Sequence, residues 1–182
     1  MPSLDWYEHE HIPLRMNYLS SFLTGARFRA SDGQSPSWLA VYDVEDVSTF
    51  SDESYTRLRY HRSAREADLL NRLQILDRKT YELVHDTGES DLTSSFRCDN
   101  PTKAVVTHEM VLGRQFDLVW WEEDVLKSLE SVKGWVRTRV FRCIESRKVE
   151  VKGSPQRSSM YLALHGASLC VSDVPSFPDL AL

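Results

Sequence analysis

Residues 5–15 read DWYEHEHIPLR and bring two aromatic side chains, two histidines and a proline together in one short stretch. Four side chains of this region recur at i, i+4, i+7 and i+11, which predicts one face of a helix: Tyr7, His11, Leu14 and Tyr18. Pro13 has no N–H to donate to the carbonyl of His9, so the helix must distort there. The pattern predicts an imidazole, that of His11, aimed inward beside a backbone irregularity.

The His9-Glu10-His11 triplet does not have the spacing of a metal site on a helix. Alternate helical residues point about 200° apart and cannot converge on one ion. The triplet also lacks the H-E-x-x-H spacing that places two ligands on one helical face. We therefore expect no metal site, with His9 facing solvent and His11 facing inward.

Outward from this helix, strand-like and helix-like segments alternate along the chain. Ser63 and Glu66 form a capping box, which predicts the start of a second helix. The apolar stripe expected to face the core from that helix comprises Ala67, Leu70, Leu73 and Leu76. The expected elements are a helix over 4–18, strands over 22–30 and 38–42, helical segments from 51 and from 63, a strand over 79–85, a strand over 104–112, a helix over 116–132, and strands over 135–144 and 161–165.

An internal repeat organises these elements. Residues 22–29 (FLTGARFR) align with 135–142 (WVRTRVFR) at an offset of 113, since 135 − 22 = 113. Residues 37–43 (SWLAVYD) align with 160–166 (MYLALHG) at an offset of 123, since 160 − 37 = 123. Two copies of this length indicate a duplicated domain rather than a solenoid. We expect a first repeat over 1–86, a linker over 87–103, a second, degenerate repeat over 104–166 and an irregular tail over 167–182.

The composition narrows the classes of function. The chain has 182 residues, a net charge of −5 and a pI near 5.7, so it lacks the basic surplus that neutralises nucleic-acid phosphates. No apolar run is long enough for a membrane span, and no signal-like N-terminus is visible. Three widely spaced cysteines suit a reducing compartment. We expect a cytoplasmic protein that binds neither nucleic acid nor membrane.

Complete repeats of this kind would have the split βαβ, ferredoxin-like arrangement. The string DWYEHEHIP, followed by GARFRA and DGQSPSWLAVYD, resembles the EthD-like branch of the dimeric α/β-barrel superfamily. This resemblance implies an α+β fold, a ferredoxin-like tandem repeat in which two units form one barrel, as a homodimer or a fused tandem. The first strand of repeat 1 and the last helix and strand of repeat 2 are expected to be missing. Either another chain supplies a strand or the sequence is truncated.

General acid–base catalysis by a histidine is the catalytic hypothesis that survives a comparison of the motifs. The chain has no G-x-S-x-G elbow and no G-x-G-x-x-G or P-loop motif, so neither a serine nucleophile nor phosphate binding is indicated. His11 can act as a general acid or base, because an imidazole titrates near neutrality. Arg27 or Arg29 could hold a carboxylate or phenolate. The aromatic residues that could enclose a substrate are Trp6, Tyr7, Trp38 and Tyr42.

The residues alone leave other interpretations open. His11 could instead be a core histidine that caps a carbonyl freed by Pro13, and the aromatic side chains could be plain core. In a barrel of this kind His11 or His165 could also be an axial haem ligand. The second repeat has Asp124 where the first has His11, so the two halves are expected to differ in chemistry.

The resemblance implies a small-molecule enzyme of secondary metabolism that uses no cofactor and no metal. We expect a lyase that decarboxylates or cyclises an aromatic polyketide, with His11 delivering the proton. The alternative enzyme is an oxidoreductase of EthD type, a cofactor-independent oxygenase that acts on a phenolic or anthrone substrate. A third hypothesis is a non-catalytic barrel protein that binds a small aromatic molecule.

Overall fold

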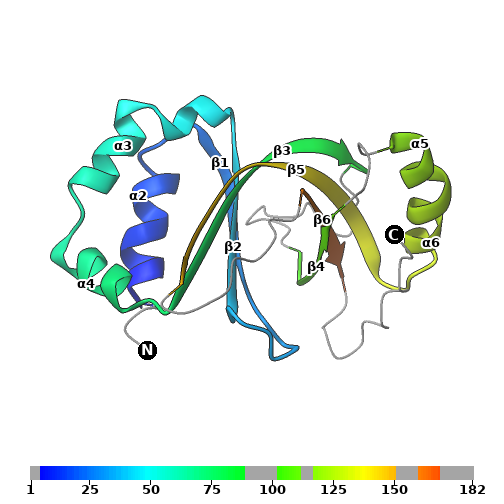
Figure 1. Ribbon diagram of the computed structural model, residues 1–182, viewed down its shortest axis with the longest axis horizontal. Helices are drawn as coiled ribbons and strands as arrows, with labels where there is room; N and C mark the ends of the chain where they lie inside the picture. Colours follow the sequence, from blue (N-terminus) through cyan, green and yellow to red (C-terminus); the bar gives the residue numbers. More distant parts are fainter. Residues whose placement is uncertain (1–4, 89–101, 112–116, 151–159, 169–182) are drawn as a thin grey trace. The chain divides into compact units, whose positions relative to one another are not determined.

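The computed structural model describes residues 5–88, 102–111, 117–150 and 160–168 (Figure 1). The fold is α+β, with one two-stranded and one four-stranded antiparallel sheet, each accompanied by helices. The chain divides into two compact units, Met1–Leu76 with Lys148–Gly153, and Asp77–Arg147 with Ser154–Leu182.

The first unit begins with a helix that changes type at the predicted irregularity. Residues Tyr7–His11 form a π-helical turn, η1, in which the N–H of Ile12 bonds the carbonyl of Tyr7. The α-helix α2, Ile12–Met16, continues it, with Pro13 in its first turn. The wider π-helical turn changes the pattern of backbone hydrogen bonds just before Pro13, and so accommodates the bond that Pro13 cannot donate. Tyr18 lies beyond the helix and is 75% exposed, so its predicted place on one helical face with Tyr7 and His11 is wrong.

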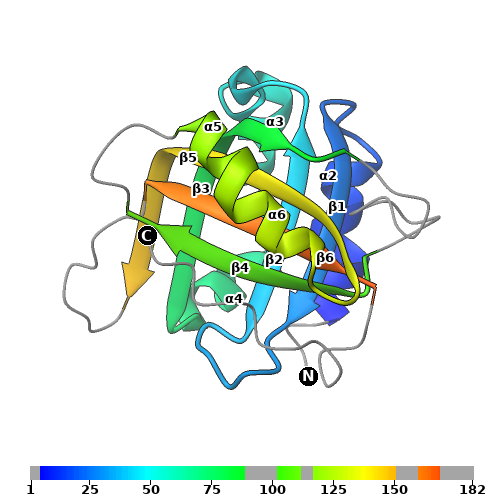
Figure 2. The ribbon, with the colours of Figure 1, turned by 90° about the vertical axis from the view of Figure 1, so that its right-hand side faces the viewer.

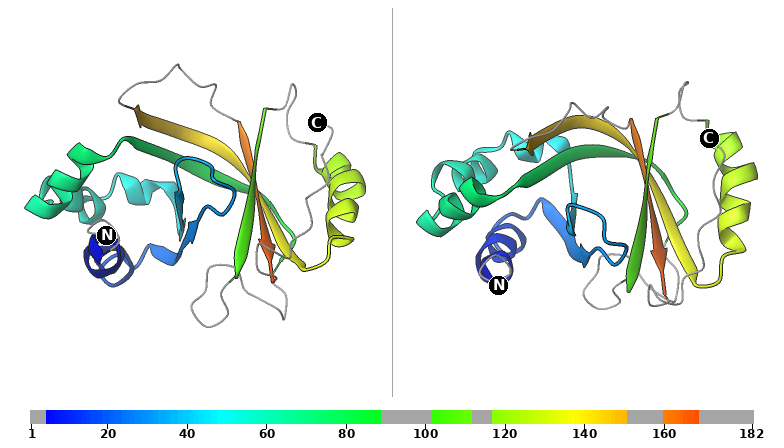
Figure 3. Two further views of the ribbon diagram at one scale, coloured as in Figure 1. Left: turned by 90° about the horizontal axis from the view of Figure 1, so that it is seen from below. Right: turned by 60° about the horizontal axis from the view of Figure 1, so that its bottom comes forward.

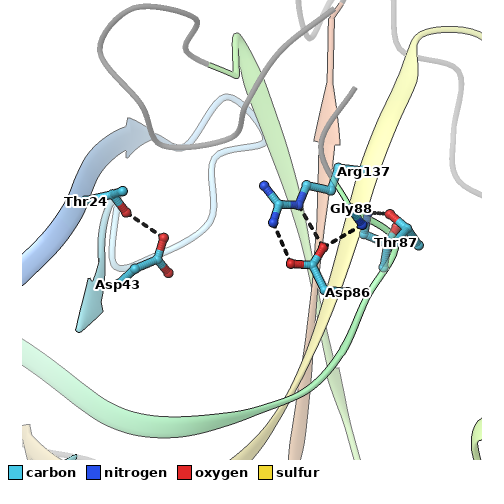
Figure 4. A network of polar contacts seen from close by, with 7 residues as sticks. Thr24, Asp43, Asp86, Thr87, Gly88 and Arg137 are labelled. Atoms are coloured by element: carbon cyan, nitrogen blue, oxygen red, sulfur yellow. Dashed lines mark hydrogen bonds and ion pairs between the residues drawn. The ribbon is translucent and has the colours of Figure 1, made fainter. Parts of the chain in front are cut away.

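Strands β1, Phe22–Arg29, and β2, Trp38–Val44, form the antiparallel hairpin of the first unit. Gly25 lies opposite Tyr42, Arg27 opposite Ala40 and Arg29 opposite Trp38. Because side chains alternate across a strand, these six residues share one face of the hairpin. The Thr24 hydroxyl donates to the carboxylate of Asp43 at 2.5 Å (Figure 4). A bulge interrupts the register between Phe22 and Thr24.

Helices η2 (Val47–Phe50), α3 (Glu53–Tyr60) and α4 (Ala64–Arg72) complete this unit and lie with α2 on the same side of the hairpin (Figure 1). Ser63 caps α4 as predicted, accepting a hydrogen bond from the N–H of Glu66. A small core forms around Leu19, Phe22 and Tyr55.

The predicted apolar stripe of α4 is wrong. The helix buries Glu66 and Leu69, whereas Ala67 is exposed and Leu73 is 39% exposed. The reason is that α4 ends at Arg72 and Leu73 adopts an extended conformation, so helical spacing no longer places Leu73 and Leu76 on its face.

The second unit contains a four-stranded sheet with the order β3-β5-β6-β4. Asp86 on β3 accepts two hydrogen bonds from the guanidinium of Arg137 on β5 (Figure 4). Glu82 of β3 pairs with Arg142 of β5. As the β3 residue number falls from 86 to 82, the β5 number rises from 137 to 142, as expected for antiparallel neighbours. The strands are β3 (Ile75–Asp86), β4 (Ala104–Met110), β5 (Trp135–Glu150) and β6 (Tyr161–Ala167).

One helical segment packs on this sheet, running through α5 (Leu118–Trp120), the π-turn η3 (Trp121–Leu126) and α6 (Lys127–Glu130). It lies across β4, β6 and β5 on one face (Figures 2 and 3). The Asp117 carboxylate caps it by accepting from the N–H groups of Val119 and Trp120. The buried core between helix and sheet comprises Met110, Trp121, Val125, Leu129, Val140, Tyr161 and Ala163.

The two hairpins have the same register once the offsets of the sequence repeat are applied. The pair Gly25↔Tyr42 becomes Thr138↔His165 when 113 is added to the first number and 123 to the second, and that pair is observed. The bulge recurs at the equivalent place, between Trp135 and Arg137. Both repeats also contain a π-helical turn before their hairpin. The likeness of the two copies therefore extends from sequence to strand register.

Some expectations lie outside the described residues, namely most of the 87–103 linker, the second strand–strand connection and nearly all of the 167–182 tail. Within the described ranges, no helix has both the length and the apolar character that crossing a membrane requires.

Candidate functional site

The first unit gathers the predicted aromatic residues around His11. The His11 ring stacks on Tyr7 with ring centroids 4.6 Å apart, and it contacts Trp6 at 4.8 Å. Trp6 is only 7% exposed, whereas the side chain of His9 is 73% exposed. The π-helical turn is responsible, because it carries Tyr7 and His11 and presents both rings on the same side.

Arg27 reaches the same cluster from β1. Its guanidinium carbon lies 4.6 Å from the Tyr7 ring centroid and 4.0 Å from the Trp38 centroid. Both distances are in the range of cation–π contacts. Arg29, two residues further on, is exposed. Of the two arginines that the sequence proposed for an anion, Arg27 is the one that lies at the predicted site.

Tyr42 closes the cluster through a hydrogen bond between its hydroxyl and that of Tyr7, 3.0 Å apart. Burial raises the pKa of both phenols, so both stay protonated at neutral pH. Gly25 makes room for the Tyr42 ring, since an added Cβ would lie 3.0 Å from two of its ring atoms. This close approach explains a glycine inside a strand.

Glu66 is the residue of this site that sequence reasoning missed. Its Oε1 lies 3.8 Å from Nδ1 of His11, and the residue is 7% exposed. Burial raises the pKa of its carboxyl, although Arg15 and Arg62 oppose the shift. The sequence indicated only a capping box. The signal that could have placed Glu66 on the buried face of α4 is its i, i+3 spacing from Leu69, which is also buried.

The second unit places different chemistry at the equivalent position. His165, which matches Tyr42, is fully buried, and its Nδ1 lies 2.8 Å from the Thr138 hydroxyl. Its Nε2 lies 3.3 Å from Nδ1 of His108. Burial, with a smaller contribution from His108, lowers the pKa of His165 to about 3, so the ring is neutral. Both ring nitrogens are engaged, which leaves neither directed at a haem iron in this arrangement.

The counterpart of His11 does not reproduce the cluster. Asp124 is exposed, and the ring at the position of Tyr7 is that of Trp120, which packs at the edge of the core. Chemistry of the acid–base type is therefore concentrated in the first unit. In the parts of the chain that the structure describes, no group of three or more His, Cys, Asp or Glu side chains is placed to hold a metal ion.

The cluster in the first unit combines a titratable ring, a nearby carboxylate, a cation and two neutral phenols. Such a set can move a proton, hold an anionic group and stack an aromatic ring. No family model, curated protein or solved structure matches this chain.

Proposed function

We propose that the chain is a small-molecule enzyme that needs no cofactor and uses His11 as a general acid and base on a phenolic aromatic substrate. The observation that supports it best is the position of His11, which is stacked on Tyr7 and 3.8 Å from a buried carboxylate. A plain core histidine would not require a buried carboxylate at its side. Decarboxylation or cyclisation of a polyketide-type acid fits these groups.

The fold that we propose is the EthD-like version of the dimeric α/β barrel, built as a ferredoxin-like tandem repeat. Its support is the shared hairpin register, with the bulge and the π-helical turn repeated in both copies. The pairing of β6 with both β4 and β5 agrees with the strand order of a ferredoxin-like unit. We also propose assembly as a homodimer, as that resemblance implies, in a cytoplasmic setting.

For a decarboxylation, the steps balance without an added reactant. The imidazolium of His11 donates its proton to the ring carbon that bears the carboxylate. The bond between that carbon and the carboxyl carbon then breaks, its electron pair restores the aromatic ring, and carbon dioxide leaves. Solvent returns the proton to His11, so one proton is consumed in each turnover. Glu66 stands where it can stabilise the charged imidazolium.

The test replaces His11 with phenylalanine, which keeps a ring on Tyr7 but cannot transfer a proton. With hydroxynaphthoic acids as substrates, carbon dioxide release should fall by two orders of magnitude or more, roughly the contribution of general acid catalysis. The melting temperature should change little, because the stacked ring is retained. Turnover that survives this change would overturn the acid–base proposal.

Two other readouts separate the alternative functions. Oxygen uptake with anthrone, in place of carbon dioxide release, would indicate the EthD-type oxygenase. Saturable binding of the aromatic acids by the wild-type protein without any turnover would instead indicate a ligand-binding role.

A further inference from the structure

Two buried N–H groups of the first unit have no hydrogen-bond acceptor among the described residues. They are the indole Nε1 of Trp6 and the Nη1 of Arg27. Trp6 is 7% exposed and the Arg27 side chain 14% exposed, so solvent reaches neither group freely. A buried donor without an acceptor is costly, because it has lost its hydrogen bonds to water and gained none in return. Both groups are donors, so each is left in need of an acceptor.

The carboxylate of Glu8, near Arg27, does not accept a hydrogen bond from the Nη1 group of Arg27. Oε1 of Glu8 lies 4.0 Å from Nη1 of Arg27, beyond hydrogen-bond distance, on a side chain that is 60% exposed. The two phenols near Arg27 are neutral, as shown above, and their hydroxyls bond each other. The charge of Arg27 is therefore only weakly balanced among the described residues of its own unit.

The contacts of Arg27 also restrict how a ligand could approach. The guanidinium carbon lies over the rings of Tyr7 and Trp38, so aromatic surface covers this part of the group. What remains is the edge, where N–H groups lie in one plane and match the two oxygens of a carboxylate. Trp6 flanks the other side of the cluster, with its ring 5.7 Å from that of Tyr7.

We propose that this cluster is a binding site for an aromatic carboxylate, whose acid group takes the edge of Arg27 and whose further acceptor takes Nε1 of Trp6. The proposal deepens the proposed function by naming the group that the site recognises, and it rests on the same site. It does not rest on the reaction, because recognition of the acid needs Arg27 and not proton transfer by His11.

The test compares β-naphthoate with its neutral isostere β-naphthamide by isothermal titration calorimetry on the full chain at neutral pH. Wild-type protein should bind the acid about tenfold or more tightly than the amide, as a charge-assisted pair implies. Arg27→Gln should remove this preference. Arg29→Gln, the exposed arginine on the same face of β1, should leave it within about twofold.

The outcomes distinguish recognition from catalysis. Binding of the acid by the His11→Phe variant with the preference intact supports the site even if no turnover is ever found. Equal affinity of the wild-type protein for acid and amide, or no binding of the acid up to about 1 mM, would overturn the proposal. An equal loss in Arg29→Gln and Arg27→Gln would also overturn it. If Arg27→Gln fails to fold, the wild-type comparison still decides.

Discussion

Glu66 is one residue with two roles, one at the start of α4 and one in the candidate site. Its backbone N–H completes the cap with Ser63, while its carboxylate turns toward His11. The sequence could predict the first role, because a capping box depends only on local spacing. It could not predict the second, which depends on α4 meeting η1 in three dimensions.

Burial of this carboxyl has a consequence for stability that can be measured. Burial raises the pKa of the Glu66 carboxyl in the folded protein above its ordinary value of 4.5. The stabilisation that follows from this shift is fully present below pH 4.5 and is lost as the pH rises through the pKa of the folded state. Glu66→Gln removes the titration. We expect the free energy of unfolding, measured by urea between about pH 4 and pH 8, to fall more steeply with pH in the wild type than in this variant.

The exposed Glu53 at the start of α3 provides the matched control. Glu53→Gln should leave the slope of stability against pH close to that of the wild type. If the wild type and Glu66→Gln have parallel curves over this range, the Glu66 carboxyl is not shifted in the direction that its burial implies.

The order of the helices and strands was easier to predict from the sequence than the residues that lie on their buried faces. The order of helices and strands follows from residue spacing, and each expected strand has a counterpart in the described residues. Two of the errors concern residues near helix ends, since Tyr18 and Leu73 lie past the last helical turn, whereas the exposed Ala67 lies within α4. The candidate site shows the same difference between what local spacing predicts and what depends on packing. The helical face with Tyr7 and His11 came from spacing, whereas the choice of Arg27 over Arg29 depended on packing against Trp38.

The hairpin of the first unit is built around a glycine that its copy does not have. Gly25 admits the Tyr42 ring, whereas the matched Thr138 hydrogen-bonds the matched His165. Gly25→Ala should therefore destabilise the protein by about 1–3 kcal/mol, as expected for overpacking, because the ring must move away from Tyr7 and Phe22. Chemical denaturation of the purified variant measures this loss.

A double-mutant cycle with Tyr42→Leu tests the cause of that loss. With the ring gone, the alanine has space, so its cost should shrink and the two changes should depart from additivity by more than about 0.5 kcal/mol. Additive losses would mean that the strain arises from the backbone or from Met16, whose Sδ lies 3.4 Å from the added carbon, rather than from Tyr42.

At the scale of the whole molecule, the two copies share a register but differ in how many neighbours their strands have. Strand β6 pairs with β5 on one side and β4 on the other. Its counterpart β2 pairs only with β1 among the described strands. The repeat was visible in the sequence, because two offsets align both hairpins. Among the described strands, this difference leaves backbone groups of β2 without a ladder partner.

Hydrogen exchange should report this difference along the chain. A two-stranded hairpin is marginal in isolation, whereas a strand with two neighbours opens only with its sheet. Backbone amides of β1 and β2 should therefore exchange about tenfold or more faster than those of 135–142 in β5 and of β6, measured by mass spectrometry on peptides that cover each strand. Equal protection of the two hairpins would show instead that a further strand covers the edge of β2. A native mass spectrum of the same sample would then separate the candidates, since a strand from a second copy doubles the mass of the particle and a strand from the same chain leaves it unchanged.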